Sequence, residues 1–265
     1  MAVIIIQPIR VNRRHNRKRP VIFLHIPKTA GTTLRSIFIR QYQPNEIVLS
    51  YDPMKWKATL SNPARQHAIN AIVGHFPYGI HRFVRKNFTY ITMLRDPVER
   101  TISLYNHIRR QPGQHYHQTV KQMSLEEFVM SEDLTGGMIG ATIHINNPQT
   151  RFLTGNKTDN FETVIHNVNR HFSVVGITDL FDESIFLMKK NLGWTNIDYR
   201  KLNISQNHSS NNEIPEHIRR LIENKNKIDV QLYHYFKQEL RKNIAALDPQ
   251  ATRELQQFKA RIQKL

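Results

Sequence analysis

The sequence predicts an α/β fold in which a central, mostly parallel sheet is flanked by helices in three layers. Short apolar runs typical of buried strands alternate along the 265 residues with longer runs of helical periodicity. A chain of this length can bury a substantial core, and α/β folds of this size commonly form one domain. Ligands of such sheets bind beyond the carboxyl ends of the strands, so residues that follow each apolar run are the first site candidates.

The apolar runs predicted as strands are residues 21–26, 70–74, 88–94 and 172–177. Helical periodicity is found at residues 32–42, 98–109, 124–130, 179–192, 215–223, 227–240 and 249–264. Asp96 is expected to cap helix 98–109, since Pro97 fits a first helical turn. In that helix Ile102, Tyr105 and Ile108 are expected to face the core, and Arg100 to form ion pairs at the surface. The remainder of residues 110–160 is predicted to be loops that contact the substrate.

The amino-acid composition limits the kinds of function that this chain can have. There is no Cys, which excludes disulfides and thiolate chemistry and favours a reducing, cytoplasmic environment. Residues 2–6 form an apolar run too short to span a bilayer. Lys and Arg exceed Asp and Glu by 38 − 21 = 17, which favours polyanionic partners. Residues 1–19 are predicted to be a basic, flexible segment, and residues 20–265 a single domain.

The first strand runs directly into the loop Pro-Lys-Thr-Ala-Gly-Thr-Thr, and a helix pattern follows. Unpaired N–H groups at a helix N-terminus bind phosphate-like anions, Gly31 allows close backbone approach, and Lys28 adds a positive charge. The hydroxyl groups of Thr29, Thr32 and Thr33 are further donors. In the common nucleoside-triphosphate loop Lys follows the last Gly, whereas here Lys28 precedes Gly31, so the expected anion is a different one.

Arg95 follows the predicted strand 88–94, and Ser103 lies eight residues later on the expected helix. A guanidinium offers a planar fork to phosphate oxygens, so the two residues could hold one anion if the Asp-Pro turn folds back. An ion pair of Arg95 with Asp96 or Glu99 would be compatible with the same sequence. Both interpretations stay open on these residues alone.

His75 follows the predicted strand 70–74 and is the candidate general base, because imidazole accepts a proton at neutral pH. The chain has 14 His, most of which we expect to be packed or at the surface; His81 is the second candidate base, and His25 is expected to orient the anion loop. No His-Glu-x-x-His or comparable pairing with carboxylates is present, so no metal is expected.

Together these three motifs resemble sulfotransferases that use 3′-phosphoadenosine 5′-phosphosulfate (PAPS), in particular the glycan-modifying branch with heparan sulfate 2-O- and 6-O-sulfotransferases and their bacterial relatives. The resemblance covers residues 20–240. It implies a P-loop-like fold, PAPS as the sulfuryl donor and a hydroxyl acceptor. Small-molecule cytosolic sulfotransferases have a loop one residue shorter and a C-terminal Gly-rich element that is missing here, which favours a saccharide or glycoconjugate acceptor.

The resemblance also implies residue roles. Lys28, Thr29, Ala30, Gly31, Thr32 and Thr33 would hold the phosphosulfate, with Lys28 stabilising charge on the bridging oxygen. Arg95 and Ser103 would hold the 3′-phosphate, and His75 would accept the proton of the attacking hydroxyl. Gln149 or Arg151, within a segment that is also similar to the family, could contact the acceptor; a loop entering a helix would look the same.

Two alternatives remain at this point. A polyanion-binding protein for nucleic acid or acidic glycan would explain the charge and would depend on the basic residues 10–19. Nucleic acid is the less expected partner because it leaves the anion loop unused. A nucleotide-dependent phosphotransferase would need Mg²⁺ ligands at a strand end, and the sequence offers no acidic strand end. No oligomeric state follows from the sequence.

Overall fold

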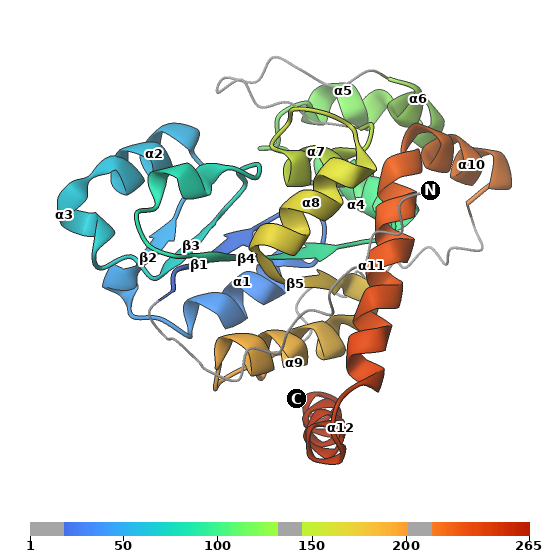
Figure 1. Ribbon diagram of the computed structural model, residues 1–265. Helices are drawn as coiled ribbons and strands as arrows, with labels where there is room; N and C mark the ends of the chain where they lie inside the picture. Colours follow the sequence, from blue (N-terminus) through green and yellow to red (C-terminus); the bar gives the residue numbers. More distant parts are fainter. Residues whose placement is uncertain (1–18, 132–144, 201–213) are drawn as a thin grey trace.

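A computed structural model describes residues 19–131, 145–200 and 214–265. The predicted basic segment therefore lies, except for Arg19, outside the described residues. The core is a five-stranded, all-parallel sheet in the order β2-β3-β1-β4-β5 (Figure 1). Its strands are β1 Val21–Leu24, β2 Ile47–Leu49, β3 Ala71–Gly74, β4 Thr89–Leu94 and β5 Phe172–Ile177. This arrangement confirms the predicted α/β fold; the single domain expected for residues 20–265 stays a prediction.

Helices cover both faces of the sheet. They are α1 Gly31–Ile39, α2 Pro53–Ser61, α3 Pro63–Gln66, α4 Pro97–Arg110, α5 His117–Gln122, α6 Leu125–Met130, α7 Pro148–Thr154, α8 Phe161–His171, α9 Phe181–Leu192, α10 Glu216–Lys225, α11 Lys227–Ala245 and α12 Pro249–Ile262. Figure 1 shows α1 and α9 on one face of the sheet and α8 on the other. Ile22, Phe23 and Leu24 of the central strand are fully buried, as expected for a parallel sheet covered on both sides.

The helix ends follow the local signals. Asp96 caps α4, where its carboxylate accepts a hydrogen bond from the N–H of Glu99, and Gly193 ends α9 with a φ of 67°. Several elements were not predicted: strand β2, which is only three residues long, and helices α2, α3, α5, α7 and α8. Of these, α5 and α7 lie within residues 110–160, which were expected to be loops apart from helix 124–130. The N-cap of α8 is Asn160, whose side chain accepts a hydrogen bond from the N–H of Thr163.

Arg100 corrects the prediction of a surface ion pair, because only 4% of it is exposed. Helix α4 is enclosed on several sides: Val98, Leu104 and Ile108 belong to a second apolar cluster that also includes residues of α6 and α10. Burial lowers the pKa of Arg100 to about 10, against the attraction of Asp229. The residue therefore needs a buried counter-charge.

Asp229 supplies that charge from the first turn of α11. Burial raises its pKa, and this is opposed by hydrogen bonds from Thr150 and Gln149 and by the charge of Arg100. Its carboxylate accepts the backbone N–H of Gln149 at 2.9 Å and of Thr150 at 2.7 Å, and the Thr150 hydroxyl at 2.6 Å. These are donors at the start of α7 that would otherwise have no partner.

The starts of α7 and α11 cap each other. The N–H of Asn147 donates to Asn226 Oδ1 at 2.9 Å, while the N–H groups of Ile228 and Asp229 donate to Asn147 Oδ1 at 3.1 and 3.2 Å. The two helix starts therefore form one rigid junction. It fixes the position of α7 and thus of Gln149, which lies in its first turn.

We predict that Asp229→Ala lowers the free energy of unfolding by about 3–5 kcal/mol, because it leaves a buried guanidinium uncompensated and exposes unpaired helix donors. The matched control is Asp248→Ala, which removes the exposed N-cap of α12 and should cost about 1 kcal/mol. Urea unfolding of both variants measures the difference. Equal losses would show that the junction contributes no more than an ordinary cap.

Candidate active site

The three predicted motifs lie at the carboxyl ends of three neighbouring strands. His75 follows β3, the anion loop follows β1, and Arg95 follows β4, in the order in which these strands pair. Leu24 at the end of β1 is in register with Gly74 at the end of β3. The N–H of His25 continues the ladder by donating to the carbonyl of Gly74 at 3.1 Å. The sheet thus brings the three motifs together along one edge.

The anion loop enters α1 in a strained conformation. Lys28 and Ala30 have φ angles of 71° and 57°, in the left-handed region that residues with a Cβ seldom adopt. Ala30 is the N-cap of α1, and no side chain caps the helix there. The first N–H groups of this nine-residue helix therefore have no side-chain acceptor, as an anion site requires.

The three threonines of the loop differ in their surroundings. Thr29 is fully buried, and its hydroxyl donates to the carbonyl of Ile26 at 2.9 Å. This hydroxyl holds the loop, which corrects the expectation that it points at the ligand; Thr29 stays a binding candidate through its backbone N–H. Thr33 is buried at the start of α1, whereas Thr32 is exposed.

Gly31 is required for a reason that the sequence did not reveal. A Cβ at this position would lie 1.7 Å from Nε2 of His25. The missing side chain thus makes room for the imidazole of a neighbouring residue, in addition to any room that a ligand needs. Burial lowers the pKa of His25 to about 2, with further repulsion from His75, Arg35 and Lys28, so the ring is neutral.

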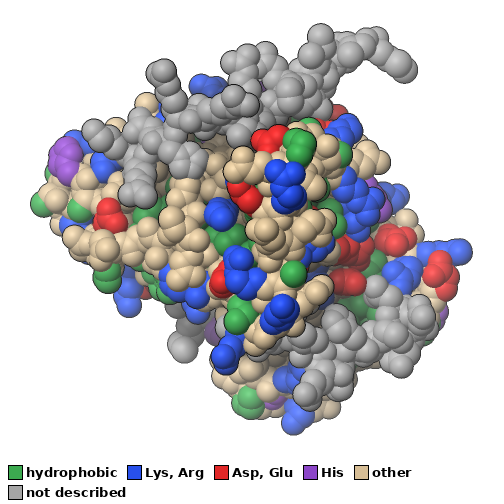
Figure 2. Space-filling view, turned by 90° about the horizontal axis from the view of Figure 1, so that it is seen from below, with side chains coloured by type: hydrophobic (Ala, Val, Ile, Leu, Met, Phe, Trp, Pro, Cys, Tyr) green, Lys and Arg blue, Asp and Glu red, His purple; other side chains and the backbone are tan. Residues whose placement is uncertain are grey.

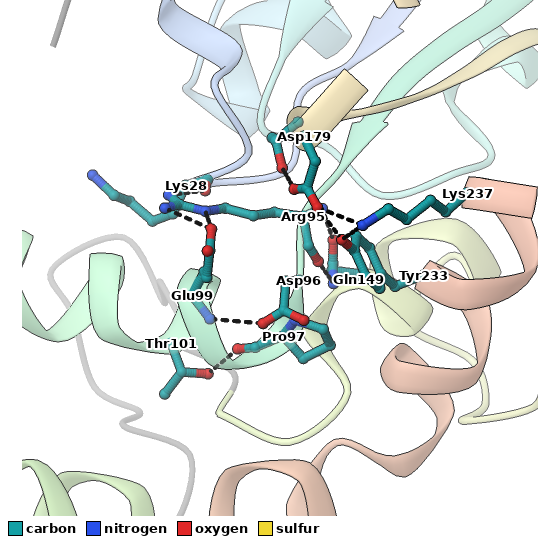
Figure 3. Close-up of polar contacts among 11 residues, drawn as sticks. Lys28, Arg95, Asp96, Pro97, Glu99, Thr101, Gln149, Asp179, Tyr233 and Lys237 are labelled. Carbon is teal, nitrogen blue, oxygen red and sulfur yellow. Dashed lines mark hydrogen bonds and ion pairs between the residues drawn. The ribbon is translucent and has the colours of Figure 1, made fainter. Parts of the chain in front are cut away.

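Lys28 lies among other cations. Burial, followed by the charges of Arg95, Arg110 and Arg100, lowers its pKa to about 8. The carbonyl oxygen of Lys28 also accepts a hydrogen bond from Nη1 of Arg95 at 3.3 Å, which ties the loop to the second motif (Figure 3). A bound anion would relieve this repulsion.

His75 has the geometry of a general base. Its Nδ1 lies 2.7 Å from the carbonyl oxygen of His25. A carbonyl can only accept, so Nδ1 carries the proton and Nε2 keeps its lone pair. Burial lowers the pKa of His75, partly offset by this hydrogen bond and reinforced by the charge of Arg35, so the ring is neutral at pH 7.

The second candidate base lies elsewhere. Nδ1 of His81 is 3.0 Å from the hydroxyl of Tyr90, the second residue of β4 and therefore near the amino end of the sheet. The ring packs on Phe88 and His171 rather than on the anion loop. This placement favours His75 over His81 as the base.

Arg95 is held at both its backbone and its side chain. The side-chain amide of Gln149 accepts from its N–H and donates to its carbonyl, both at 2.9 Å. Its Nε lies 3.3 Å from Oε2 of Glu99, and Figure 3 shows the guanidinium between Glu99 and Lys28. The helix ion pair left open by the sequence is therefore present, and the 3′-phosphate role of Arg95 stays a prediction.

Ser103 lies one turn after Glu99 on the same face of α4, which continues to His107 and Arg110. Its hydroxyl has no hydrogen-bond partner among the described residues, and its side chain is half-buried. Burial lowers the pKa of His107, followed by the charges of Lys28 and Arg110. On one side of Ser103, Glu99 pairs with Arg95, and on the other side the charge of Lys28 acts on His107. The spacing of four residues could have identified His107.

Two residues predicted to contact the acceptor are engaged in the fold. Gln149 is 1% exposed and fixes Arg95, and Nε of Arg151 pairs with Asp159 at 3.2 Å. No pattern in the sequence signals the contact of Gln149 with Arg95, which joins residues 54 positions apart. Gln149 is thus a positioning residue for the second motif.

Asp179 lies two residues after the end of β5, the strand next to β4 in the sheet. Burial raises its pKa, but hydrogen bonds from Lys237 and Tyr233 outweigh burial and lower it. Nζ of Lys237 lies 2.7 Å from its Oδ2, and the hydroxyl of Tyr233 donates to the same oxygen (Figure 3). This carboxylate is therefore neutralised by its own partners.

Comparison with known proteins assigns the chain to a family. A family model for galactose-3-O-sulfotransferases matches residues 6–265. This chain belongs to the galactose-3-O-sulfotransferase family. The match confirms the resemblance to glycan sulfotransferases and extends it beyond residues 20–240.

The individual relatives share only a modest sequence identity with this chain. The chain is 25% identical to galactose-3-O-sulfotransferase 3 of Mus musculus over 96% of its own length and 65% of the relative's. It is 27% identical to galactosylceramide sulfotransferase of Bos taurus, over 83% and 56% of the two lengths. It is 24% identical to heparan-sulfate 6-O-sulfotransferase 3 of Homo sapiens, over 82% and 56%. The chain thus spans less than two thirds of these proteins.

The described parts of the chain contain no group of three or more His, Asp or Glu side chains arranged to hold a metal ion. None of their helices is long and apolar enough to cross a membrane. The expectations of a metal-free enzyme and of a cytoplasmic location stay predictions.

We predict that Gly31→Ala destabilises the protein by about 1–3 kcal/mol, since its Cβ would overlap the ring of His25. Gly113→Ala is the matched control, because a Cβ there would meet no atom within 4 Å. Adding His25→Ala to Gly31→Ala should recover part of the loss. Thermal unfolding of the three variants tests this. A Gly31→Ala protein as stable as the control would contradict the packing account.

Proposed function

We propose that this chain is a PAPS-dependent sulfotransferase that transfers a sulfuryl group to a sugar hydroxyl. The observation that carries the proposal is the placement of a neutral base, His75, at the strand end beside the loop that holds Lys28. Membership of the galactose-3-O-sulfotransferase family supports the reaction class, and the names of the relatives support a carbohydrate acceptor.

The residues present fit a donor with two anionic ends. The uncapped N-terminus of α1 and the ammonium of Lys28 suit a phosphosulfate. Ser103, whose hydroxyl has no partner among the described residues, and the guanidinium of Arg95 suit a second phosphate. Arg95 now pairs with Glu99 and could bind that phosphate in two ways. It could exchange the carboxylate for the phosphate, or use its further N–H donors while it keeps the contact with Glu99.

PAPS, when bound, supplies the sulfuryl group and a bisphosphate leaving group. His75 accepts the proton of the acceptor hydroxyl at Nε2, because Nδ1 is committed to the carbonyl of His25. Lys28 stabilises negative charge at the loop, and Arg95 with Ser103 fixes the far end of the nucleotide. The protein thus contributes positioning and electrostatic stabilisation, as in phosphoryl transfer.

Calorimetry with 3′-phosphoadenosine 5′-phosphate, the desulfated product, tests the donor site. The wild type should bind it at least about tenfold more tightly than ADP, because a charge-assisted phosphate contact contributes ~1.5–3 kcal/mol. Arg95→Ala should remove the preference for the bisphosphate without lowering the affinity for ADP. Glu99→Gln should keep this preference or increase it. Equal affinity of the wild type for both nucleotides would refute the assignment of PAPS.

The pH dependence of kcat/KM tests the two catalytic groups. It should rise as His75 loses its proton, at a pH below 6.5, since burial lowers its pKa. It should fall above pH of about 8 as Lys28 is neutralised. Lys28→Arg should shift the alkaline decline of kcat/KM to higher pH. His75→Ala should abolish the acid limb of the profile and lower kcat at least about 100-fold. An acid limb that persists in His75→Ala would reject His75 as the base.

A further inference from the structure

Tyr51 extends the row of strand-end residues by one strand. It follows β2, and Leu49 of this strand is in register with Val73 of β3, so Tyr51 lies beside His75. The ring centroids of these two residues are 4.5 Å apart. Tyr51 is also 37% exposed, which is unusual for a large aromatic residue in contact with a candidate base. The row across the sheet is Tyr51, His75, Lys28 and Arg95.

The ring of Tyr51 is anchored at its hydroxyl end. Nη1 of Arg35 donates to this hydroxyl at 3.2 Å, which leaves the hydroxyl proton for Nδ1 of His25 at 3.3 Å. The guanidinium of Arg35 also lies 5.9 Å from the ring centroid. These contacts hold the ring in place while Tyr51 remains 37% exposed, so a ligand would meet an already ordered side chain.

We propose that Tyr51 and Arg35 form an acceptor platform, on which a pyranose ring stacks against Tyr51 and presents its hydroxyl to His75. The proposal rests on the proposed function, because it defines the acceptor half of the same site. The platform lies on the side of His75 opposite to Lys28, as transfer between an acceptor and a donor requires. Arg35 adds hydrogen-bond donors for the oxygens at the edge of the sugar.

The names of the family and of its relatives suggest galactose as the sugar, and its chemistry suits such a platform better than that of glucose. The axial 4-hydroxyl of galactose leaves the C–H groups at positions 3, 4 and 5 on one face, which forms an apolar patch. An aromatic face is electron-rich and packs well against such C–H groups. In glucose the hydrogen at position 4 lies on the opposite face, so the patch is smaller. Stacked in this way, galactose keeps its equatorial 3-hydroxyl at the ring edge, where a neighbouring base can reach it.

The experiment measures sulfation of methyl β-D-galactopyranoside and methyl β-D-glucopyranoside from PAPS. Tyr51→Ala should raise the KM for the galactoside at least about tenfold, whereas Tyr51→Phe, which keeps the ring, should stay within about threefold. The preference for galactoside over glucoside should fall in Tyr51→Ala. Leu49→Ala, an exposed position near Tyr51 in the chain, is the matched control and should change neither substrate.

Binding of 3′-phosphoadenosine 5′-phosphate separates the two proposals. All variants should bind it like the wild type, because the platform contributes nothing to the donor site. Unchanged KM values in Tyr51→Ala, with an active wild type, would overturn the platform alone. A loss of kcat at constant KM would also overturn it, because Tyr51 would then act through the histidines. A wild type that neither binds the bisphosphate nor sulfates either sugar would overturn the proposed function together with the platform.

Discussion

The hydrogen bond from Nδ1 of His75 to the carbonyl of His25 is the contact on which the site depends. It crosses from β3 to β1 directly beyond the paired strand ends and fixes the tautomer and the orientation of the base. The side chain of His25 then packs where Gly31 has no Cβ, at the start of α1. One residue therefore joins the base to the helix end that would bind the donor. Displacing His25 would disturb both halves of the site together.

The second constraint is the concentration of positive charge at this edge of the sheet. Arg95, Arg110 and Arg100 lie near enough to lower the pKa of Lys28, and Glu99 pairs with Arg95. On the face shown in Figure 2, Lys and Arg side chains are scattered rather than gathered in one patch. A net charge of +17 alone thus says less about function than the few cations grouped around the loop.

Much of this site could be predicted because its signals are local. A strand followed by a loop and a helix places Lys28, and the capping signal of Asp96 places the start of α4. The parallel sheet then brings the strand ends together. Even the contact of Arg95 with Glu99 was foreseen as an alternative, since residues four apart on a helix are neighbours.

The features that were missed join residues far apart in the chain. Asp229 caps a helix that begins about 80 positions earlier, and its charge acts on Arg100, which the packing around α4 buries. The contact between Gln149 and the backbone of Arg95 is of the same kind. Neither periodicity nor spacing within one element contains this information, because a polar side chain in a loop or on a helix looks the same whether its partner is water or a distant backbone group.

A crystal structure of the protein with 3′-phosphoadenosine 5′-phosphate would test the central claim most directly. We expect the 5′-phosphate within hydrogen-bond distance of the N–H groups of residues 30–33. We expect the 3′-phosphate between Arg95 and Ser103, and Nε2 of His75 facing the sulfuryl position. A nucleotide bound away from the carboxyl ends of β1 and β4, or a 3′-phosphate that leaves the pair of Arg95 with Glu99 intact and contacts neither Arg95 nor Ser103, would contradict it.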